Sequence, residues 1–421
     1  GGYSTACKTR SSCEARKWNA LRTRMQVWWT RMLEQDCDVR MSPENALCVK
    51  TSGDRMSGEG VQAGEWPQNG EQSAGRRPRL ARAAHRLGVM PLLGWVRGAW
   101  RHDVRILAYH RVLESVEPAG FRFDAELISA SSDAFRRQLA IVKRRFAPMR
   151  FDELADCLDR GRPVPRRAVL ITFDDGYDDN YRIAWPILRD AGLSAMFFVS
   201  TGHIDSGRPY AYDWLVHMLC TTRADRLLAP ELEIDWPIPE ALGACRDLAA
   251  RLLDRIKTLD AQAQQSLIDR LQVEWSMPAA AGHPDCRPMS WAQLREMHAG
   301  GMEIGSHGVD HRMLAKMTPA AMREEVAASK RAIERELGGD VLVMSYPVGG
   351  TDAYDGAVVA ATREAGYRLA CSYRAGPESL HPQTRFEMRR IPVERHTGAD
   401  WFEGMLALPE VFCHRSRARN G

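Results

Sequence analysis

Two adjacent carboxylates, Asp174 and Asp175, stand at the end of a short apolar run and are well placed for catalysis or ligand binding. The run 168–173 is rich in β-branched and aromatic residues, which predicts a buried strand. Side chains alternate along a strand, so one of two neighbouring carboxylates would point inward, at a cost unless it has a partner. Ligands and catalytic groups gather at the carboxyl ends of strands in α/β proteins. Taken alone, the run is equally consistent with an ordinary strand-to-turn junction, where Asp and Gly are common.

Two histidines, His307 and His311, follow a second predicted strand at 302–306. Side chains four residues apart face one point if the turn between them is helical. Two neutral imidazoles and one carboxylate are a known ligand set for a catalytic divalent metal that keeps an open position for water. Either histidine alone would suit a core or surface role, but the position at a strand end favours a metal site.

A third segment, Tyr346, Pro347, Val348 and Gly349, ends the predicted strand 341–346. Its glycine allows a backbone amide to approach a ligand closely. Such an amide can donate to a developing oxyanion. An ordinary strand-to-helix turn explains the same residues.

The elements that must position these residues alternate between strand and helix. The predicted strands cover residues 104–109, 168–173, 195–200, 302–306, 341–346, 368–373 and 388–393. Strands separated by helices predict a parallel sheet, closed or nearly closed into a barrel. Residues 230–288 interrupt the alternation. We expect them to form a helical insertion that covers one end of the domain, because they are polar and show no strand pattern.

Taken together, these motifs resemble a known family. Thr172-Phe173-Asp174-Asp175-Gly176, then Ser306-His307 with His311, then Tyr346-Pro347-Val348-Gly349 resemble the polysaccharide deacetylases of the NodB-homology type, carbohydrate esterase family 4. The run 106–112 resembles the entry strand of the exopolysaccharide-modifying branch. The resemblance covers about residues 104–408. It implies a distorted seven-stranded (β/α) barrel, which agrees with the strand count.

The resemblance also implies roles. Asp175, His307 and His311 would hold a divalent metal, usually zinc, and Asp174 would be the general base that takes a proton from the attacking water. The Val348 amide would help to hold the oxyanion. The implied substrate is an N-acetylated glycan, from which N-acetyl groups of amino sugars in a polysaccharide or its precursor are removed. Alternatives are an O-acetyl esterase, another amide hydrolase with the same site, or a catalytically silent glycan-binding domain.

The sequence departs from the family in the third motif. Met344 and Ser345 stand where many members carry an arginine that orients the base, and Val348 replaces a tyrosine. Arg389 or Arg390, on the predicted strand 388–393, is the candidate for the missing cation.

The general acid and the sugar subsite are less clear from the motifs. The family's late Leu-x-His motif is not cleanly present, so His396 is the nearest candidate for the acid, followed by His110 and His381. Asp213 and Trp214 could line a sugar subsite, because aromatic rings offer flat apolar faces to pyranose rings. Core packing is the alternative for both residues.

The remaining features concern the amino terminus and the compartment. Residues 1–77 are predicted to be a disordered extension before the domain at 104–415. Residues 78–103 form a basic, Trp-containing amphipathic segment that either packs on this domain or contacts an anionic membrane surface peripherally.

A net charge of +4 over 421 residues gives no indication of nucleic-acid binding. Ten cysteines without Cys-x-x-Cys pairs fit free thiols, which favours the cytoplasm or its membrane face. Export stays open, because the chain does not begin with methionine.

Overall fold

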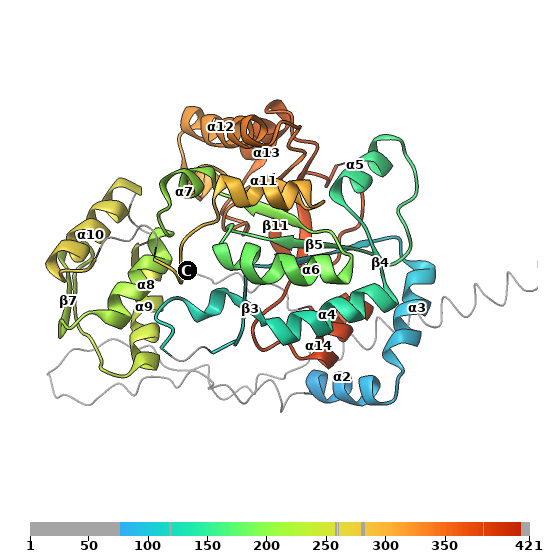
Figure 1. Cartoon of the computed structure of the whole chain (residues 1–421), viewed down its shortest axis with the longest axis horizontal. Coiled ribbons are helices and arrows are strands. Elements are labelled where there is room, and N and C mark those ends of the chain that lie inside the picture. Colours follow the sequence, from blue (N-terminus) through green and yellow to red (C-terminus); the bar gives the residue numbers. More distant parts are fainter. Residues whose placement is uncertain are drawn as a thin grey trace, which may run out of the picture. The chain divides into compact units, whose positions relative to one another are not determined.

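The computed structural model describes residues 76–117, 120–256, 259, 261–278, 283–381 and 383–413 (Figure 1). Residues 1–75, and with them almost all of the predicted extension, lie outside the described residues. The disorder expected there therefore stays a prediction.

Seven parallel strands close into a barrel. In spatial order they are β1 (Val104–Tyr109), β12 (Met388–Pro392), β11 (Leu369–Ala375), β10 (Val343–Ser345), β9 (Glu303–Ser306), β6 (Met196–Val199) and β5 (Ala168–Phe173). The ring closes because β5 pairs with β1 along its whole length. The seven predicted strands and the seven-stranded (β/α) barrel are thus confirmed. The two-residue β4 (Ala147–Pro148) adds to β5 outside the ring, and β2 (Arg111–Leu113) pairs separately with β3 (Ile128–Ser131).

Helices cover the outside of the barrel, which is why five of its strands are buried on both faces. Apolar side chains fill the interior, and the outward-facing ones pack under helices. The covering helices are α4 (Ser132–Arg145), α5 (Phe151–Asp159), α6 (Trp185–Ala191), α11 (Trp291–Ala299), α12 (Pro319–Leu337), α13 (Gly356–Glu364) and α14 (Ala399–Ala407).

Several helix ends follow from local sequence. Ser290 and Gln293 form a capping box at the start of α11. Gly338 ends α12 in the left-handed conformation, with φ 74°. Pro186 lies in the first turn of α6, where it removes no needed hydrogen bond, and a π-helical turn (Asn180–Ala184) precedes it. These helix ends can be predicted from the sequence, because each depends on residues within one turn.

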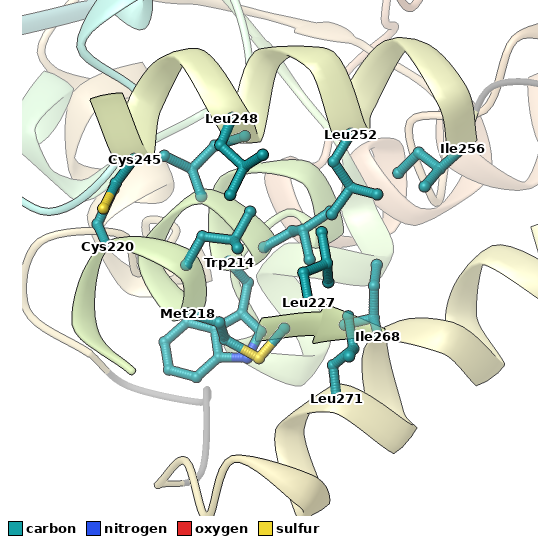
Figure 2. Close-up of a cluster of buried hydrophobic side chains, with 14 of the residues drawn as sticks. Trp214, Met218, Cys220, Leu227, Cys245, Leu248, Leu252, Ile256, Ile268 and Leu271 are labelled. Carbon is teal, nitrogen blue, oxygen red and sulfur yellow. The ribbon is translucent and has the colours of Figure 1, made fainter. Parts of the chain in front are cut away.

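A second hydrophobic core lies beside the barrel (Figure 2). It is built by α8 (Ala211–Thr221), α9 (Leu242–Ile256), α10 (Ala261–Glu274) and an antiparallel hairpin of β7 (Arg226–Ala229) and β8 (Ile234–Pro237). The prediction that residues 230–288 are polar and lack strands is therefore wrong. The hairpin strands have only four residues each and stand next to prolines, so their pattern is weak. In the sequence of α9, charged residues alternate with the apolar residues that face the core, so the segment reads as polar.

The basic segment at 78–103 forms two helices, α2 (Arg76–Arg86) and α3 (Met90–Trp100), which pack on α14. His85 Nδ1 lies 2.5 Å from a carboxylate oxygen of Glu403. The chain then enters β1 at Val104. Among the described residues, no helix combines the length and apolarity needed to cross a bilayer.

Candidate metal and active site

The structure brings Asp175, His307 and His311 together at one end of the barrel. Asp175 Oδ1 lies 3.5 Å from His307 Nε2 and 3.4 Å from His311 Nε2. The potential ligand atoms of all three residues lie within 4.8 Å of one another. They meet because β6 pairs with both β5 and β9, so the carboxyl ends of β5 and β9 lie close together.

Left-handed backbone at the strand ends aims two of these side chains. Asp175 has φ 73° and His311 has φ 55°, and Gly176 follows Asp175 with φ 71°. Asp and His tolerate this region better than most residues, although each such position costs about 1–3 kcal/mol. A Cβ on Gly176 would lie 2.9 Å from Val199 Cγ1, so only glycine fits there.

Contacts behind His307 fix its ring. Its Nδ1 donates to the Ser345 carbonyl oxygen at 2.7 Å, which leaves Nε2 as the ligand atom toward Asp175. The loop that follows is held by Glu325 from α12, whose Oε1 accepts hydrogen bonds from the backbone N–H groups of Val309 and Asp310 at 2.8 and 2.7 Å. Sequence reasoning missed Glu325, because nothing local to a helix interior indicates that it closes a distant loop.

The remaining oxygens of Asp175 show that the residues present fit a cation. Tyr212 donates its hydroxyl to Oδ2 at 3.1 Å, and Tyr210 donates to the Asp175 backbone carbonyl at 2.6 Å. Asp175 Oδ1 is buried and accepts no hydrogen bond from any described residue. A buried carboxylate oxygen without a partner is costly, and a cation shared with the two imidazoles would satisfy it. Tyr210 and Tyr212 were not predicted from the sequence, where the only signal is a pair of aromatic residues at the start of α8.

Protonation in the site also suits a metal. Burial lowers the pKa of His311 to about 3, so its imidazole is neutral. Burial raises the pKa of Asp175, but His307 and His311 lower it by more, and the net pKa falls below the usual range of a carboxyl. Burial lowers the pKa of His307, yet Asp175 and Asp174 raise it above its ordinary value. A proton therefore competes with a metal for His307, and metal affinity should weaken as the pH falls.

Asp174 is held apart from this cluster by Arg390 of β12. The guanidinium donates to both carboxylate oxygens at 2.7 Å, and also to Ser345 Oγ at 3.0 Å. Asp174 and Arg390 are both buried, whereas the neighbouring Arg389 points outward. Burial raises the pKa of Asp174, but Arg390 and His307 together outweigh it and keep the pKa below its usual value. The carboxylate is thus ionised and oriented, as a proton acceptor must be.

The third predicted segment divides into exposed and buried residues. Val348 has φ 62°, a strained conformation for a β-branched residue, and its side chain is 51% exposed. Its backbone N–H donates to no described residue. Pro347 and Gly349 are buried, and a Cβ on Gly349 would lie 2.5 Å from the Tyr373 backbone nitrogen.

Tyr346 is part of the core. It is fully buried, and its hydroxyl donates to the Phe386 carbonyl at 2.9 Å. Its ring stacks on Tyr354 at 4.7 Å between centroids. The Tyr346 side chain therefore supports the predicted segment from within the core, because its polar atom already has a partner inside the protein.

The predicted sugar subsite at Asp213 and Trp214 is wrong. Asp213 is completely buried and accepts hydrogen bonds from the Asp124 backbone N–H and the Tyr177 hydroxyl. Trp214 belongs to the second core, where its Nε1 donates to Gln272 (Figure 2). The alternative of core packing holds for both, since helix α8 turns these side chains inward and leaves the partly exposed Tyr212 beside the ligand cluster.

The three histidines considered as general acid lie in different surroundings. His110 follows β1, is partly exposed, and its ring centroid is 5.5 Å from that of Tyr373. His110 also lowers the pKa of Asp174 and that of Asp175. Burial has a larger influence on both pKa values, and so do Arg390 on Asp174 and His311 on Asp175. His396 lies on an exposed turn after β12, and no described contact links it to the ligand cluster. His381 lies in the segment whose Glu378 pairs with Val104, at the opposite end of the barrel.

Comparisons with known proteins agree with this geometry. The profile described as Polysaccharide deacetylase matches residues 161–229 and 237–370. YxkH of Bacillus subtilis, whose name places it among the polysaccharide deacetylases, is 22% identical over 236 residues, which cover 56% of this chain and 55% of YxkH. The poly-beta-1,6-N-acetyl-D-glucosamine N-deacetylase of Escherichia coli is 32% identical over 92 residues, which cover 21% of this chain and 13% of the relative. This chain thus spans about half the length of YxkH and a small part of the Escherichia coli protein.

Two solved structures have a similar fold. One is the deacetylase PplD of Streptococcus pyogenes, with a TM-score of 0.47 and 17% identity, over 74% of this chain and 98% of PplD. The other is IcaB of Ammonifex degensii, with a TM-score of 0.45 and 19% identity, over 72% of this chain and 97% of IcaB. The profile match places residues 161–370 of this chain in the polysaccharide deacetylase family, and the names of the sequence relatives agree with it.

Proposed function

We propose that this protein is a metal-dependent hydrolase that removes N-acetyl groups from the amino sugars of a polysaccharide or its precursor. The observation that carries the proposal is the buried Asp175–His307–His311 cluster, with its unpartnered Oδ1, beside the ionised Asp174. Two imidazole nitrogens and one carboxylate oxygen suit Zn²⁺, which we propose as the metal. The named activity of the Escherichia coli relative supports an N-acetylated glucosamine polymer as the substrate class.

A divalent cation held by these ligands would lower the pKa of a water molecule and polarise the acetyl carbonyl. Asp174 accepts the proton of the attacking water, and Arg390 keeps this carboxylate ionised and in place. The Val348 N–H, which is uncommitted among the described residues, is placed to donate to the oxyanion. The carbon–nitrogen bond then breaks, giving acetate and a free sugar amine, and the departing nitrogen needs a proton from an acid.

The test of this function is acetate release by the purified chain. After treatment with a chelator and reloading with Zn²⁺, it should release acetate from oligomers of N-acetylglucosamine, with one free amine formed per acetate. The chelated protein should release none. Acetate from O-acetylated glycans but not from N-acetylated ones would show an esterase instead, and no acetate from either would contradict the proposal.

We expect His110 to be the general acid, because it follows the carboxyl end of β1, at the same end of the barrel as the ligand cluster, whereas His396 lies on an exposed turn and His381 at the opposite end. His110→Asn should lower N-acetyl hydrolysis by about 10²–10⁴-fold, the usual contribution of a general acid. Hydrolysis of 4-nitrophenyl acetate, whose leaving group departs without a proton, should fall by much less in the same variant.

The matched control is His396→Asn, on an exposed turn. It should change neither reaction by more than about twofold, because an exposed side chain outside the site supplies neither packing nor a proton. A large loss in His396→Asn with an active His110→Asn would reverse the assignment.

A further inference from the structure

The outward face of α3 is apolar. Of the seven large hydrophobic residues that are exposed in the described part of the chain, three lie on α3, namely Leu92 (59% exposed), Trp95 (60%) and Trp100 (39%), and Leu87 (77%) lies in the turn before this helix. Leu92 and Trp95 are three residues apart and therefore point to the same side of the helix. Exposed apolar side chains that gather on one helix face indicate a contact surface more strongly than scattered ones.

The opposite face of α3 fixes the helix to the barrel. Its buried residues include Gly94, where a Cβ would lie 3.3 Å from the Cβ of Ala407 on α14. Arg97 is buried on the same side and pairs with both Asp103 and Glu410. The exposed face of α3 is thus presented by a helix that is already held in place, so docking does not have to order it first.

The acidic and basic residues of the segment that carries this face are unequal in number. Residues 76–102 contain no Asp or Glu, and they contain Arg76, Arg77, Arg79, Arg82, Arg86, Arg97 and Arg101. Arg97 is paired with the buried Asp103 and with Glu410, whereas Arg86, at the end of α2, and Arg101, just after α3, are exposed. Arg166, also exposed, donates to the Ala99 carbonyl near the end of α3 and adds a further positive charge beside Trp100.

An apolar face with Trp and Leu, on a segment that contains arginines and no acidic residue, matches an anionic lipid surface. A protein partner would have to provide an acidic rim around an apolar groove. We propose that α3 docks the protein on an anionic phospholipid surface, with Leu92 and Trp95 inserted among the headgroups. This interaction is separate from the proposed hydrolase activity.

The position of α3 makes this docking compatible with an open active site. Helix α3 leads into the amino-terminal end of β1, whereas the ligand cluster lies at the carboxyl ends of β5 and β9. In Figure 1, α3 lies to the right of the barrel, and α7 (Thr201–Ser206) and α8, which border the cluster, lie to its left. A protein docked through α3 therefore presents its site away from the lipid.

Co-sedimentation of the full chain with vesicles tests the proposal. The unaltered protein should bind vesicles of phosphatidylcholine with 30% phosphatidylglycerol, and should bind pure phosphatidylcholine vesicles much less. Binding should weaken as salt is added, because exposed charges are screened. The double variant Leu92→Ser/Trp95→Ser should bind the anionic vesicles at least about tenfold less, since it loses both apolar side chains that would be buried among the headgroups.

The matched control is Leu228→Ser/Val273→Ser, which removes two exposed apolar side chains from the second core region. It should bind vesicles like the unaltered protein. Both double variants should keep the activity on soluble oligomers, and circular dichroism should show that both are folded. The proposal is overturned if the unaltered chain does not bind anionic vesicles, or if Leu92→Ser/Trp95→Ser binds them equally well. A loss of dimerisation in that variant, without vesicle binding by the unaltered chain, would instead assign the face to a second copy.

Discussion

Asp174→Asn is expected to lower the rate of acetate release by about 10²–10⁴-fold while leaving the metal in place. An amide at this position cannot accept the proton of the attacking water, although it keeps nearly the same shape. The ligand atoms are on other residues, so metal content should stay close to one ion per chain. Acetate assays and elemental analysis of the same sample measure the two quantities together.

The change also affects stability, because Asp174 is the carboxylate partner of the fully buried Arg390. Breaking a buried pair on one side costs about 3–5 kcal/mol, since it leaves an uncompensated charge. The double variant Asp174→Asn/Arg390→Gln removes that charge and should recover part of the lost stability. It should not recover activity, and a return of activity in the double variant would show that Asp174 is not the base.

His307→Ala is expected to lose the metal and with it all measurable acetate release. His307 supplies one of three protein ligands and is oriented by the Ser345 carbonyl, so its removal takes away both a donor and the ordered ring. Elemental analysis after dialysis against a low zinc concentration should find well below one ion per chain. His311→Ala should lose the metal and the activity in the same way. It should also destabilise the fold less than His307→Ala, because His311 is less deeply buried than His307.

His203→Ala is the matched control for loss of an imidazole near the site. The His203 ring lies 4.0 Å from that of Tyr210, and its Nδ1 bonds the Arg208 carbonyl, but it is not one of the three clustered ligands. It should retain the metal. If His307→Ala and His311→Ala both kept one tightly bound ion, the assigned ligand set would be wrong.

Some features of the site could be read from neighbouring residues. The apolar runs before Asp174 and His307 predict strands, and the left-handed turns after them need Gly176 and suit Asp175. The alternation of strand and helix then places both motifs at the same end of a parallel barrel. The convergence of Asp175, His307 and His311 follows from these local signals together with the resemblance to a family.

Other features depend on contacts that no local pattern encodes. Arg390 and not Arg389 pairs with Asp174, because Arg390 is on the inward face of β12. A shift of the strand register by one residue would exchange the two arginines. Tyr346, Asp213 and Trp214 looked available for substrate, but the packing of α8 and of the segment before β12 buries them. Tyr212 reaches Asp175 only because the second core sets the position of α8.

The sequence by itself therefore determined the seven strands, the helix ends and the residue types at the ligand cluster, because these depend on periodicity and on turns of a few residues. Only the tertiary structure decided which side chains pair across the barrel and which lie in a core. Asp174 and Arg390 are 216 residues apart. Their contact exists because β5 and β1 close the ring, and that closure is a property of the whole barrel.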